Sequence, residues 1–322
     1  MTELHVVFGT GPLGRATAHT LREFGKNVRM INRSGRLVDP PAGVEIVASD
    51  AYDVAKNIAS TRGATAIYQC AQPHYHEWVT KFPSLQRAIL EAAIANQAKL
   101  IVADNLYMYG KFSGTLTEEA PWNAHTRKGK VRAAMANEVL AAHQAGKLPV
   151  AIGRASDFFG PYDSALTDYA ILPALQGKPV NLLGDVNQPH SFTYIPDFGR
   201  LLATLGTRDE ALGQIWFAPV NPPVSQREFV QVLETELGQP VKTRAAGPLL
   251  MRLLGLFNPS MAETVEMMYQ WTAPFVIDAH KAEQAFGLQA TPLATAMRET
   301  IAWGRQHLSL QASTIADAKP SA

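Results

Sequence analysis

The stretch Gly9-Thr10-Gly11-Pro12-Leu13-Gly14 carries the clearest chemical signal in the chain. It follows an apolar, β-branched run at residues 4–8 and opens a segment, 13–24, whose apolar residues recur at helical spacing. Glycines in such a strand–turn–helix unit permit a tight turn, let the backbone approach a pyrophosphate, and allow close packing of helix on strand. The free N–H groups at the helix start then bind the anion. This stretch therefore predicts a dinucleotide-binding site.

The residues after the second expected strand, 28–31, indicate which dinucleotide is bound. They read Asn32-Arg33-Ser34-Gly35-Arg36, and no acidic residue appears before Asp39. An acid at this point binds the ribose 2′-hydroxyl of NAD, whereas an arginine accommodates the 2′-phosphate of NADP. Asn32, Arg33 and Ser34 therefore favour NADP(H), with NAD as the alternative. A solvated basic turn would have the same composition, because surface arginines are common.

Two more strand ends supply expected cofactor contacts. The strand at 44–48 leads to Asp50, which either accepts a hydrogen bond from the adenine amino group or caps the helix expected at 51–61. The strand at 66–70 ends in Cys70-Ala71-Gln72. Open parallel sheets bind their ligands beyond the carboxyl ends of the strands, so we assign Cys70, Ala71 and Gln72 to the cofactor.

Aromatic, histidine and acidic side chains follow the same strand ends on what we expect to be the substrate side. These candidate substrate-binding residues are His74, Tyr75, Tyr107, Asp157, Phe158 and His190. The pair His74 and His76 has a spacing seen in metal sites, but no further ligand spacing supports it. We therefore predict a pocket lining without a metal.

Strand-like runs alternate with helical patterns as far as a sixth strand at 150–154, with helices expected at 83–96 and 128–145. This alternation predicts an α/β fold: a Rossmann-type, doubly wound parallel sheet with helices on both faces. Beyond it, short strands and helices among many prolines and glycines predict a smaller α+β C-terminal cap domain. We place the dinucleotide-binding domain at residues 1–160, with sheet segments returning near 191–219. The cap takes most of 161–308, and 309–322 is expected to be an unstructured tail.

We expect further helices in the C-terminal half of the cap. The stretches 248–257 and 261–271 predict a pair of apolar helices, which either form a mobile lid or a plain core or dimer face. A final helix is expected at 292–308.

The composition limits the kinds of molecule that the protein is expected to bind. The 322 residues are 47% hydrophobic and 18% charged with a formal net charge of +1, which gives no field for binding nucleic acid. Cys70 is the single cysteine, so an intrachain disulfide is excluded and a cytoplasmic location is expected. The sequence contains no apolar run of the roughly 20 residues that a membrane span needs. We expect a small-molecule substrate and no membrane partner.

Taken together, residues 3–305 resemble the extended short-chain dehydrogenases/reductases, also called the NAD-dependent epimerase/dehydratase family. The resemblance rests on four features: the turn Gly9–Gly14; Ala71-Gln72-Pro73; Tyr109-Gly110; and Arg154 with Phe159-Gly160-Pro161, followed by Phe192-Thr193-Tyr194-Ile195-Pro196-Asp197. It implies a dinucleotide-dependent oxidoreductase or epimerase/dehydratase. It also implies a homodimer formed through the helices at Pro83 and Lys128.

The chain departs from this family at the catalytic residues. The family uses a Ser or Thr after the fifth strand and Tyr-x-x-x-Lys at the start of the next helix. Here the corresponding positions are Asn105, Lys128 and Arg132, and no tyrosine occurs between Tyr109 and Tyr162. The usual proton relay, in which lysine lowers the pKa of tyrosine, is therefore missing.

Three hypotheses follow. Lys128 or Lys130 replaces the tyrosine as acid/base; or Tyr75, Tyr107 or Tyr109 reaches the substrate while Asn105 polarises its oxygen; or the protein binds NADP(H) without turnover and acts as a sensor. We take Lys128, Asn105, Tyr109 and Arg132 as the catalytic candidates. The leading hypothesis is an atypical NADP(H)-dependent reductase of a small, apolar carbonyl, imine or enone, with a redox-neutral epimerase/dehydratase and the sensor as alternatives.

Overall fold

The computed structural model describes residues 3–317 except 163, 165 and 248–262. The expected helix at 248–257 and the first residues of the one at 261–271 lie outside the described residues.

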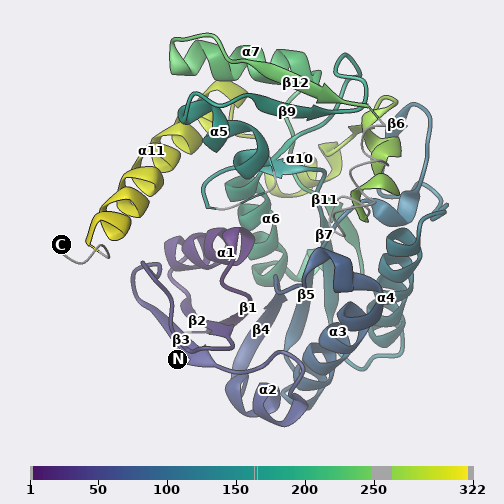
Figure 1. Cartoon of the computed structure of the whole chain (residues 1–322). Coiled ribbons are helices and arrows are strands. Elements are labelled where there is room, and N and C mark those ends of the chain that lie inside the picture. The colour runs from purple at the N-terminus through teal and green to yellow at the C-terminus, as the bar shows by residue number, and fades with distance from the viewer. Residues whose placement is uncertain (1–2, 163, 165, 248–262, 318–322) are drawn as a thin grey trace.

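A seven-stranded parallel sheet forms the centre of the molecule (Figure 1). Its strand order is β11-β7-β5-β4-β1-β2-β3. The strands are β1 (Leu4–Phe8), β2 (Asn27–Asn32), β3 (Val44–Ala48), β4 (Ala64–Gln69), β5 (Lys99–Asp104), β7 (Val150–Arg154) and β11 (Ile215–Phe217). The central strands β1, β4, β5 and β7 are largely buried and mostly apolar, because both faces of a parallel sheet are covered. The predicted Rossmann-type sheet is confirmed, and the order reverses between β1 and β4, where such sheets bind ligands.

Helices cover both faces of this sheet. One face is covered by α2 (Val54–Ser60), α3 (Trp78–Ala95) and α4 (Arg127–Gln144), and the other by α1 (Pro12–Glu23) and α6 (Ile195–Thr207) (Figure 1). The helices α1 and α6 pack very closely, since a Cβ atom at Gly199 would lie 2.7 Å from the Cβ of Ala16. The chain thus returns to the sheet after residue 190, through α6 and then β11.

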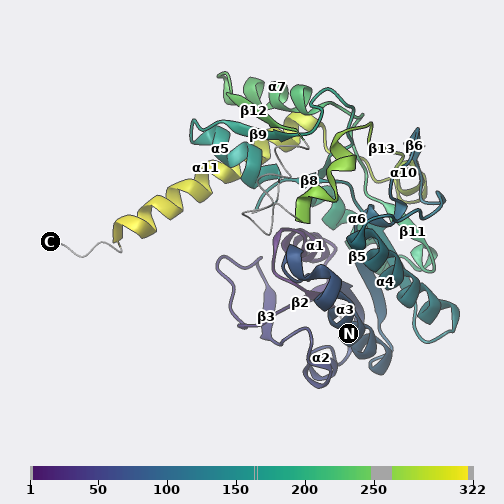
Figure 2. The same cartoon turned by 45° about the vertical axis from the view of Figure 1, so that its right-hand side comes forward.

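A second group of elements lies beyond the carboxyl edge of the sheet (Figure 2). It contains α5 (Leu172–Leu175), β9 (Val180–Leu183), α7 (Gln226–Leu237), β12 (Thr243–Ala246) and α11 (Leu293–Asp317). These elements enclose their own apolar core, which includes Ile171, Phe229, Leu233 and Met297. Short strand pairs connect this cap to the sheet: β8 (Phe158–Phe159) with β10 (Thr193–Tyr194), and β6 (Thr115–Leu116) with β13 (Val276–Ile277). The helix α10 (His280–Phe286) contacts β11.

Two boundaries differ from the expected ones. The helix α3 begins at Trp78, and Pro83 lies inside it rather than at its start. The buried side chains of Trp78 and Phe82 hold the first turns against the sheet, which outweighs the backbone hydrogen bond lost at proline. The helix α11 continues to Asp317, so residues 309–317 are helical where an unstructured tail was expected. That segment contains no glycine or proline to end the helix.

Candidate active site

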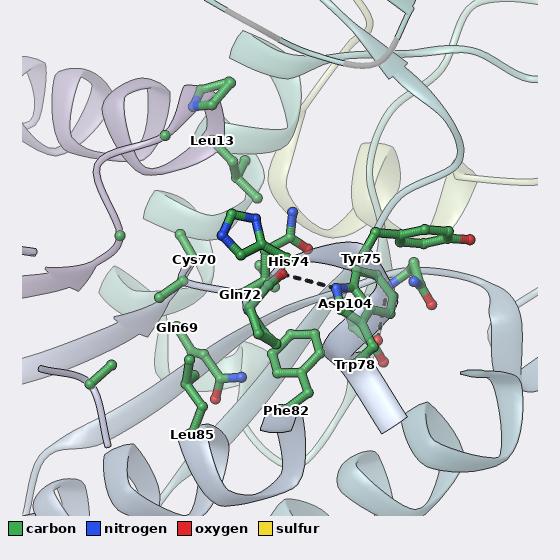
Figure 3. Close-up of a pocket in the computed structure, with 18 of the residues that line it drawn as sticks. Leu13, Gln69, Cys70, Gln72, His74, Tyr75, Trp78, Phe82, Leu85 and Asp104 are labelled. Atoms are coloured by element: carbon green, nitrogen blue, oxygen red, sulfur yellow. Dashed lines mark hydrogen bonds between the residues drawn. The ribbon is translucent and has the colours of Figure 1, made fainter. Parts of the chain in front are cut away.

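A cleft of about 790 Å³ lies along the carboxyl edge of the sheet. It brings together most of the residues that the sequence singled out. On the cofactor side these are Gly9, Thr10, Gly11, Pro12, Leu13, Asn32, Arg33, Asp50, Cys70, Ala71 and Gln72. On the substrate side they are His74, Tyr75, Asn105, Tyr107, Arg132, Asp157 and Phe158. Figure 3 shows the part of this cleft between Leu13, the end of β4 at Gln69 to Gln72, and the side chains of Trp78, Phe82 and Leu85 from α3.

The glycine-rich turn has the geometry that a dinucleotide pyrophosphate requires. Gly9 has φ +102°, a conformation that side chains rarely adopt. A Cβ atom at Gly14 would lie 2.1 Å from the carbonyl oxygen of Gly9, so only glycine lets α1 approach the turn this closely. Gly11 precedes the helix and Pro12 occupies its first turn, where a missing N–H costs nothing. The N-terminus of α1 therefore faces the cleft with free N–H groups.

A second hollow of about 490 Å³ adjoins this turn and is basic. It is lined by Thr10, Arg15, Asn32, Arg33, Ser34, Arg36, Leu37 and Val38. The Asn32 side chain shapes the loop, since its Oδ1 accepts hydrogen bonds from the N–H groups of Ser34 (3.1 Å) and Gly35 (2.7 Å). Arg33 lines both this hollow and the main cleft and is exposed.

The structure distinguishes between the two roles expected for Asp50, which follows β3. The N-cap of α2 is Asp53, whose side chain accepts a hydrogen bond from the N–H of Lys56 (3.0 Å). Asp50 is exposed, lines the cleft, and accepts a hydrogen bond from the N–H of Tyr52 (3.1 Å). Its carboxylate therefore faces the region beside β3 and does not cap the helix.

A buried network of ion pairs and hydrogen bonds lies at the end of β5. Asp104 accepts a hydrogen bond from Nε of Arg132 (2.8 Å) at one oxygen and from Nε of Arg154 (3.0 Å) at the other. Arg154 also donates to the Tyr109 hydroxyl (2.7 Å), which donates to the carbonyl oxygen of Glu118 (3.1 Å). Burial raises the pKa of Tyr109 to about 12, although Arg154 acts in the opposite direction. Tyr109 is thus committed to this network and is absent from the described lining of the cleft, whereas Arg132 and Asp104 belong to it.

Lys128 lies at the start of α4, fully buried and outside the described lining of the cleft. Its Nζ atom contacts the carboxylates of Glu263 and Glu266 and lies 4.4 Å from the centre of the Tyr75 ring. Glu266 also accepts a hydrogen bond from the backbone N–H of Arg127 (3.2 Å). Lys128 therefore links α4 to the segment of the cap that carries Glu263 and Glu266. Lys130 is exposed on the same helix.

Two tyrosines and an asparagine line the substrate side of the cleft. The hydroxyls of Tyr75 and Tyr107 lie 3.3 Å apart. Burial raises the pKa of both. The Asn105 side chain accepts a hydrogen bond from the N–H of Tyr107 (3.1 Å), which fixes the loop after β5. Both tyrosines line the cleft, and their hydroxyls are within hydrogen-bond distance of each other.

Asp157 follows β7 and points into the cleft, and its partner is the buried His190. The two side chains are 3.0 Å apart, from His190 Nε2 to Asp157 Oδ2. His190 is not part of the described lining of the cleft, so its contact with a ligand would pass through Asp157.

Sequence reasoning missed the residues that hold the candidate side chains in place. The carboxylates Asp104, Glu263 and Glu266 determine where Arg132 and Lys128 lie, yet none was a candidate. A signal existed for Asp104, which is a polar residue at the carboxyl end of a buried strand. No spacing in the sequence relates Glu263 and Glu266 to Lys128. Among the described residues, no group of three or more His, Cys, Asp and Glu side chains is arranged to hold a metal ion.

The fold and the cleft define a Rossmann-type protein with a dinucleotide-binding turn. The chain belongs to the NAD dependent epimerase/dehydratase family, whose model matches residues 6–216. A curated relative, a 3beta-hydroxysteroid-dehydrogenase/decarboxylase of Arabidopsis thaliana, is 23% identical over 264 residues. That match takes in 76% of this chain and 44% of the plant protein, so the chain spans less than half of the relative's length.

Solved structures share the fold over nearly the whole chain. The dTDP-glucose 4,6-dehydratase DesIV of Streptomyces venezuelae, solved with NAD bound, superposes with a TM-score of 0.76 at 18% identity, covering 95% of this chain and 98% of that one. The UDP-glucuronic acid 4-epimerase of Bacillus cereus, also with NAD, gives a TM-score of 0.75 at 17% identity with the same coverage. None of the helices in the described part of the chain is long and apolar enough to cross a membrane.

Proposed function

We propose that this protein is an NADP(H)-dependent reductase that acts on a small, largely apolar substrate carrying a carbonyl, imine or activated alkene. One observation carries the proposal: a single cleft runs from the glycine-rich turn to the hydroxyls of Tyr75 and Tyr107. When bound, the dinucleotide supplies a hydride donor or acceptor. The residues of the cleft bind and orient the two partners.

The preference for NADP(H) over NAD is supported by the basic hollow beside the turn. Arg33 and Arg36 line it together with the Ser34 hydroxyl, and these groups suit a ribose 2′-phosphate. The end of β2 carries no acid that would hold a 2′-hydroxyl. The structural relatives are NAD complexes, so NAD is the alternative cofactor.

The apolar character of the substrate is supported by the inner walls of the cleft. Tyr75, Trp78, Phe82 and Tyr107 contribute aromatic rings there. The buried cations on this side are already paired: Lys128 with two carboxylates of the cap and Arg132 with Asp104. Such pairing disfavours a sugar nucleotide, whose diphosphate needs cationic partners.

For a carbonyl substrate, the proton is best supplied by the tyrosine pair. Tyr75 and Tyr107 both face the cleft, and Asn105 lines it beside them. Lys128 is buried in ion pairs with Glu263 and Glu266, and Tyr109 is held by Arg154. We therefore favour Tyr75 and Tyr107 over the other acid/base candidates.

A redox-neutral epimerase or dehydratase is the second candidate, because the family and the solved relatives have those activities by name. Such an enzyme would return the hydride to the same substrate, with no net change of the dinucleotide. A sensor without turnover is the third candidate, and the pairing of Lys128 with the cap is compatible with it.

A titration of the purified protein with NADPH and NADH, followed by incubation with ketones, imines and enones, tests these proposals. Tighter binding of NADPH and its oxidation by a compound of the panel are expected. Conversion of a sugar nucleotide without net oxidation would favour the epimerase or dehydratase. Binding without any turnover would favour the sensor, and no binding of either dinucleotide would overturn all three.

A further inference from the structure

Asp157 offers a carboxylate oxygen to a ligand at the substrate end of the cleft. Its side chain is 27% exposed and lines the cleft. The hydrogen bond with His190 uses Oδ2, and no described residue donates a hydrogen bond to Oδ1. This hydrogen bond with the imidazole orients the carboxylate. The pair therefore holds a carboxylate in a defined position at the cleft wall.

The His190 ring packs against aromatic residues. It stacks on Trp271 with ring centres 4.3 Å apart and planes inclined by 1°, and on Phe275 at 5.2 Å and 24°. Only 3% of its side chain is exposed. Because His190 cannot turn in this stack, the direction of the Asp157 carboxylate is set before any ligand arrives.

Three tyrosines lie within electrostatic range of this carboxylate. Burial is the main cause of the raised pKa of Tyr75 and Tyr107, and the negative charge of Asp157 adds to it, as it does for the raised pKa of Tyr269. These three tyrosines are therefore within electrostatic reach of Asp157. The hydroxyl of Tyr269 is buried with no hydrogen-bond partner among the described residues. Asp157, Tyr75 and Tyr107 line the same cleft, where a carboxylate attracts a cation through its charge and an aromatic ring does so through its quadrupole.

The buried cations near this end of the cleft pair with carboxylates other than Asp157. Lys128 contacts Glu263 and Glu266, and Arg132 is held by Asp104. Lys128 thus contacts two carboxylates, Arg132 and Arg154 share one, and the partner of Asp157 is a histidine.

Building on the proposed reductase function, we propose that the substrate is a small cyclic iminium cation and that Asp157 is its counter-ion. The iminium carbon accepts a hydrogen nucleus with two electrons from the reduced nicotinamide, forming a C–H bond as the C4–H bond breaks. The π pair of the C=N bond becomes the nitrogen lone pair. The substrate is reduced to a neutral amine, the dinucleotide is oxidised, and the positive charge passes from one to the other.

This chemistry needs no proton donor in the reducing step. A ketone becomes an alkoxide unless an acid protonates its oxygen, which is the task of the tyrosine that is absent from the start of α4. An iminium nitrogen carries its positive charge on arrival and leaves uncharged. The presence of Asp157 and the missing tyrosine thus point to the same substrate class.

Binding of a cation that cannot be reduced tests the proposal separately from turnover. The probe is N,N-dimethyl-tetrahydroisoquinolinium, and tetralone is the neutral compound of similar size; both are titrated by calorimetry into the wild type, Asp157→Asn and Asp185→Asn. Asp185 is an exposed carboxylate in a turn of the cap and serves as the matched control. We expect the wild type and the control to bind the cation about tenfold more tightly than tetralone, and Asp157→Asn to lose this preference.

A salt series on the wild type provides a measurement that needs no variant. The dissociation constant of the cation should rise with ionic strength, while that of tetralone should not. Equal binding of the two probes, or a preference for the cation that survives in Asp157→Asn, would overturn the assignment. A parallel NADPH titration distinguishes the two proposals. If the protein binds NADPH but does not prefer the cation, only the proposal of an iminium substrate is overturned. If it prefers the cation but does not bind NADPH, the proposed reductase function is overturned.

Discussion

The Nζ atom of Lys128 lies 3.2 Å from Oε1 of Glu266, and the carboxylate of Glu266 also accepts hydrogen bonds from the backbone at the start of α4. Glu263 contacts the same ammonium. This cluster connects the cap to α4 at the position that the sequence resemblance assigns to the family's catalytic tyrosine. An anchoring role and a catalytic role for Lys128 have different consequences when the side chain is removed.

Replacement of Lys128 by Met should destabilise the protein by about 1–3 kcal/mol, measured by urea unfolding. The lysine is fully buried, but the two glutamates keep 17% and 19% of their side chains exposed, and Arg127 remains to pair with them. Lys130→Met, on the exposed face of the same helix, should have no measurable effect on unfolding. Unchanged stability of Lys128→Met with abolished turnover would assign Lys128 to acid/base catalysis instead.

Replacement of Asp104 by Asn should cost about 3–5 kcal/mol of unfolding free energy, because two buried guanidinium groups lose their shared carboxylate. The side chains of Arg132, Arg154 and Asp104 are at most 3% exposed. Asp209→Asn is the control, since Asp209 pairs with Lys99 while 83% of its side chain is exposed. A loss no larger in Asp104→Asn than in the control would show that the buried network contributes little to stability.

The sequence was sufficient for the sheet and for the glycine-rich turn at its edge, because these depend on local patterns. Gly9 and Gly14 are required by the backbone of one turn, and each strand is a short apolar run. The identity of the proton donor could not be predicted from the sequence, because it depends on contacts between distant segments. Whether Lys128 faces the cleft or a carboxylate depends on Glu263, which lies 135 residues further along the chain. The burial of Tyr109 likewise depends on Arg154, which comes from a different strand.

Replacement of Arg33 by Ala should weaken NADPH binding by roughly tenfold to a hundredfold while leaving NADH binding nearly unchanged. The reason is that Arg33 would contact only the 2′-phosphate, the group that distinguishes the two dinucleotides. Fluorescence titration of both cofactors measures the two affinities, and Arg62→Ala, an exposed arginine elsewhere on the surface, serves as the control. An equal loss for NADPH and NADH would mean that Arg33 contacts a part common to both, and the preference for NADP(H) would lose its main support.

The stability of the protein should fall between about pH 6.5 and pH 4 in a way that depends on His5. This residue is fully buried on β1, with its Nδ1 atom 2.8 Å from the Tyr68 hydroxyl. Burial lowers the pKa of His5 to about 4, although Glu3 acts in the opposite direction. The unfolded chain, with a histidine pKa near 6.5, therefore binds a proton that the folded chain does not bind until about pH 4.

Stability from His5 is thus fully present above about pH 6.5 and is lost as the pH falls, by roughly 3 kcal/mol at about pH 4. Urea unfolding at a series of pH values measures this slope. His5→Gln keeps a hydrogen-bonding side chain without a titrating group, so its stability should vary less over this range than that of the wild type. His19→Gln is the control, because the side chain of His19 is 69% exposed and its removal should leave the slope as it is. Identical pH dependence in the wild type and His5→Gln would mean that folding does not lower the pKa of His5.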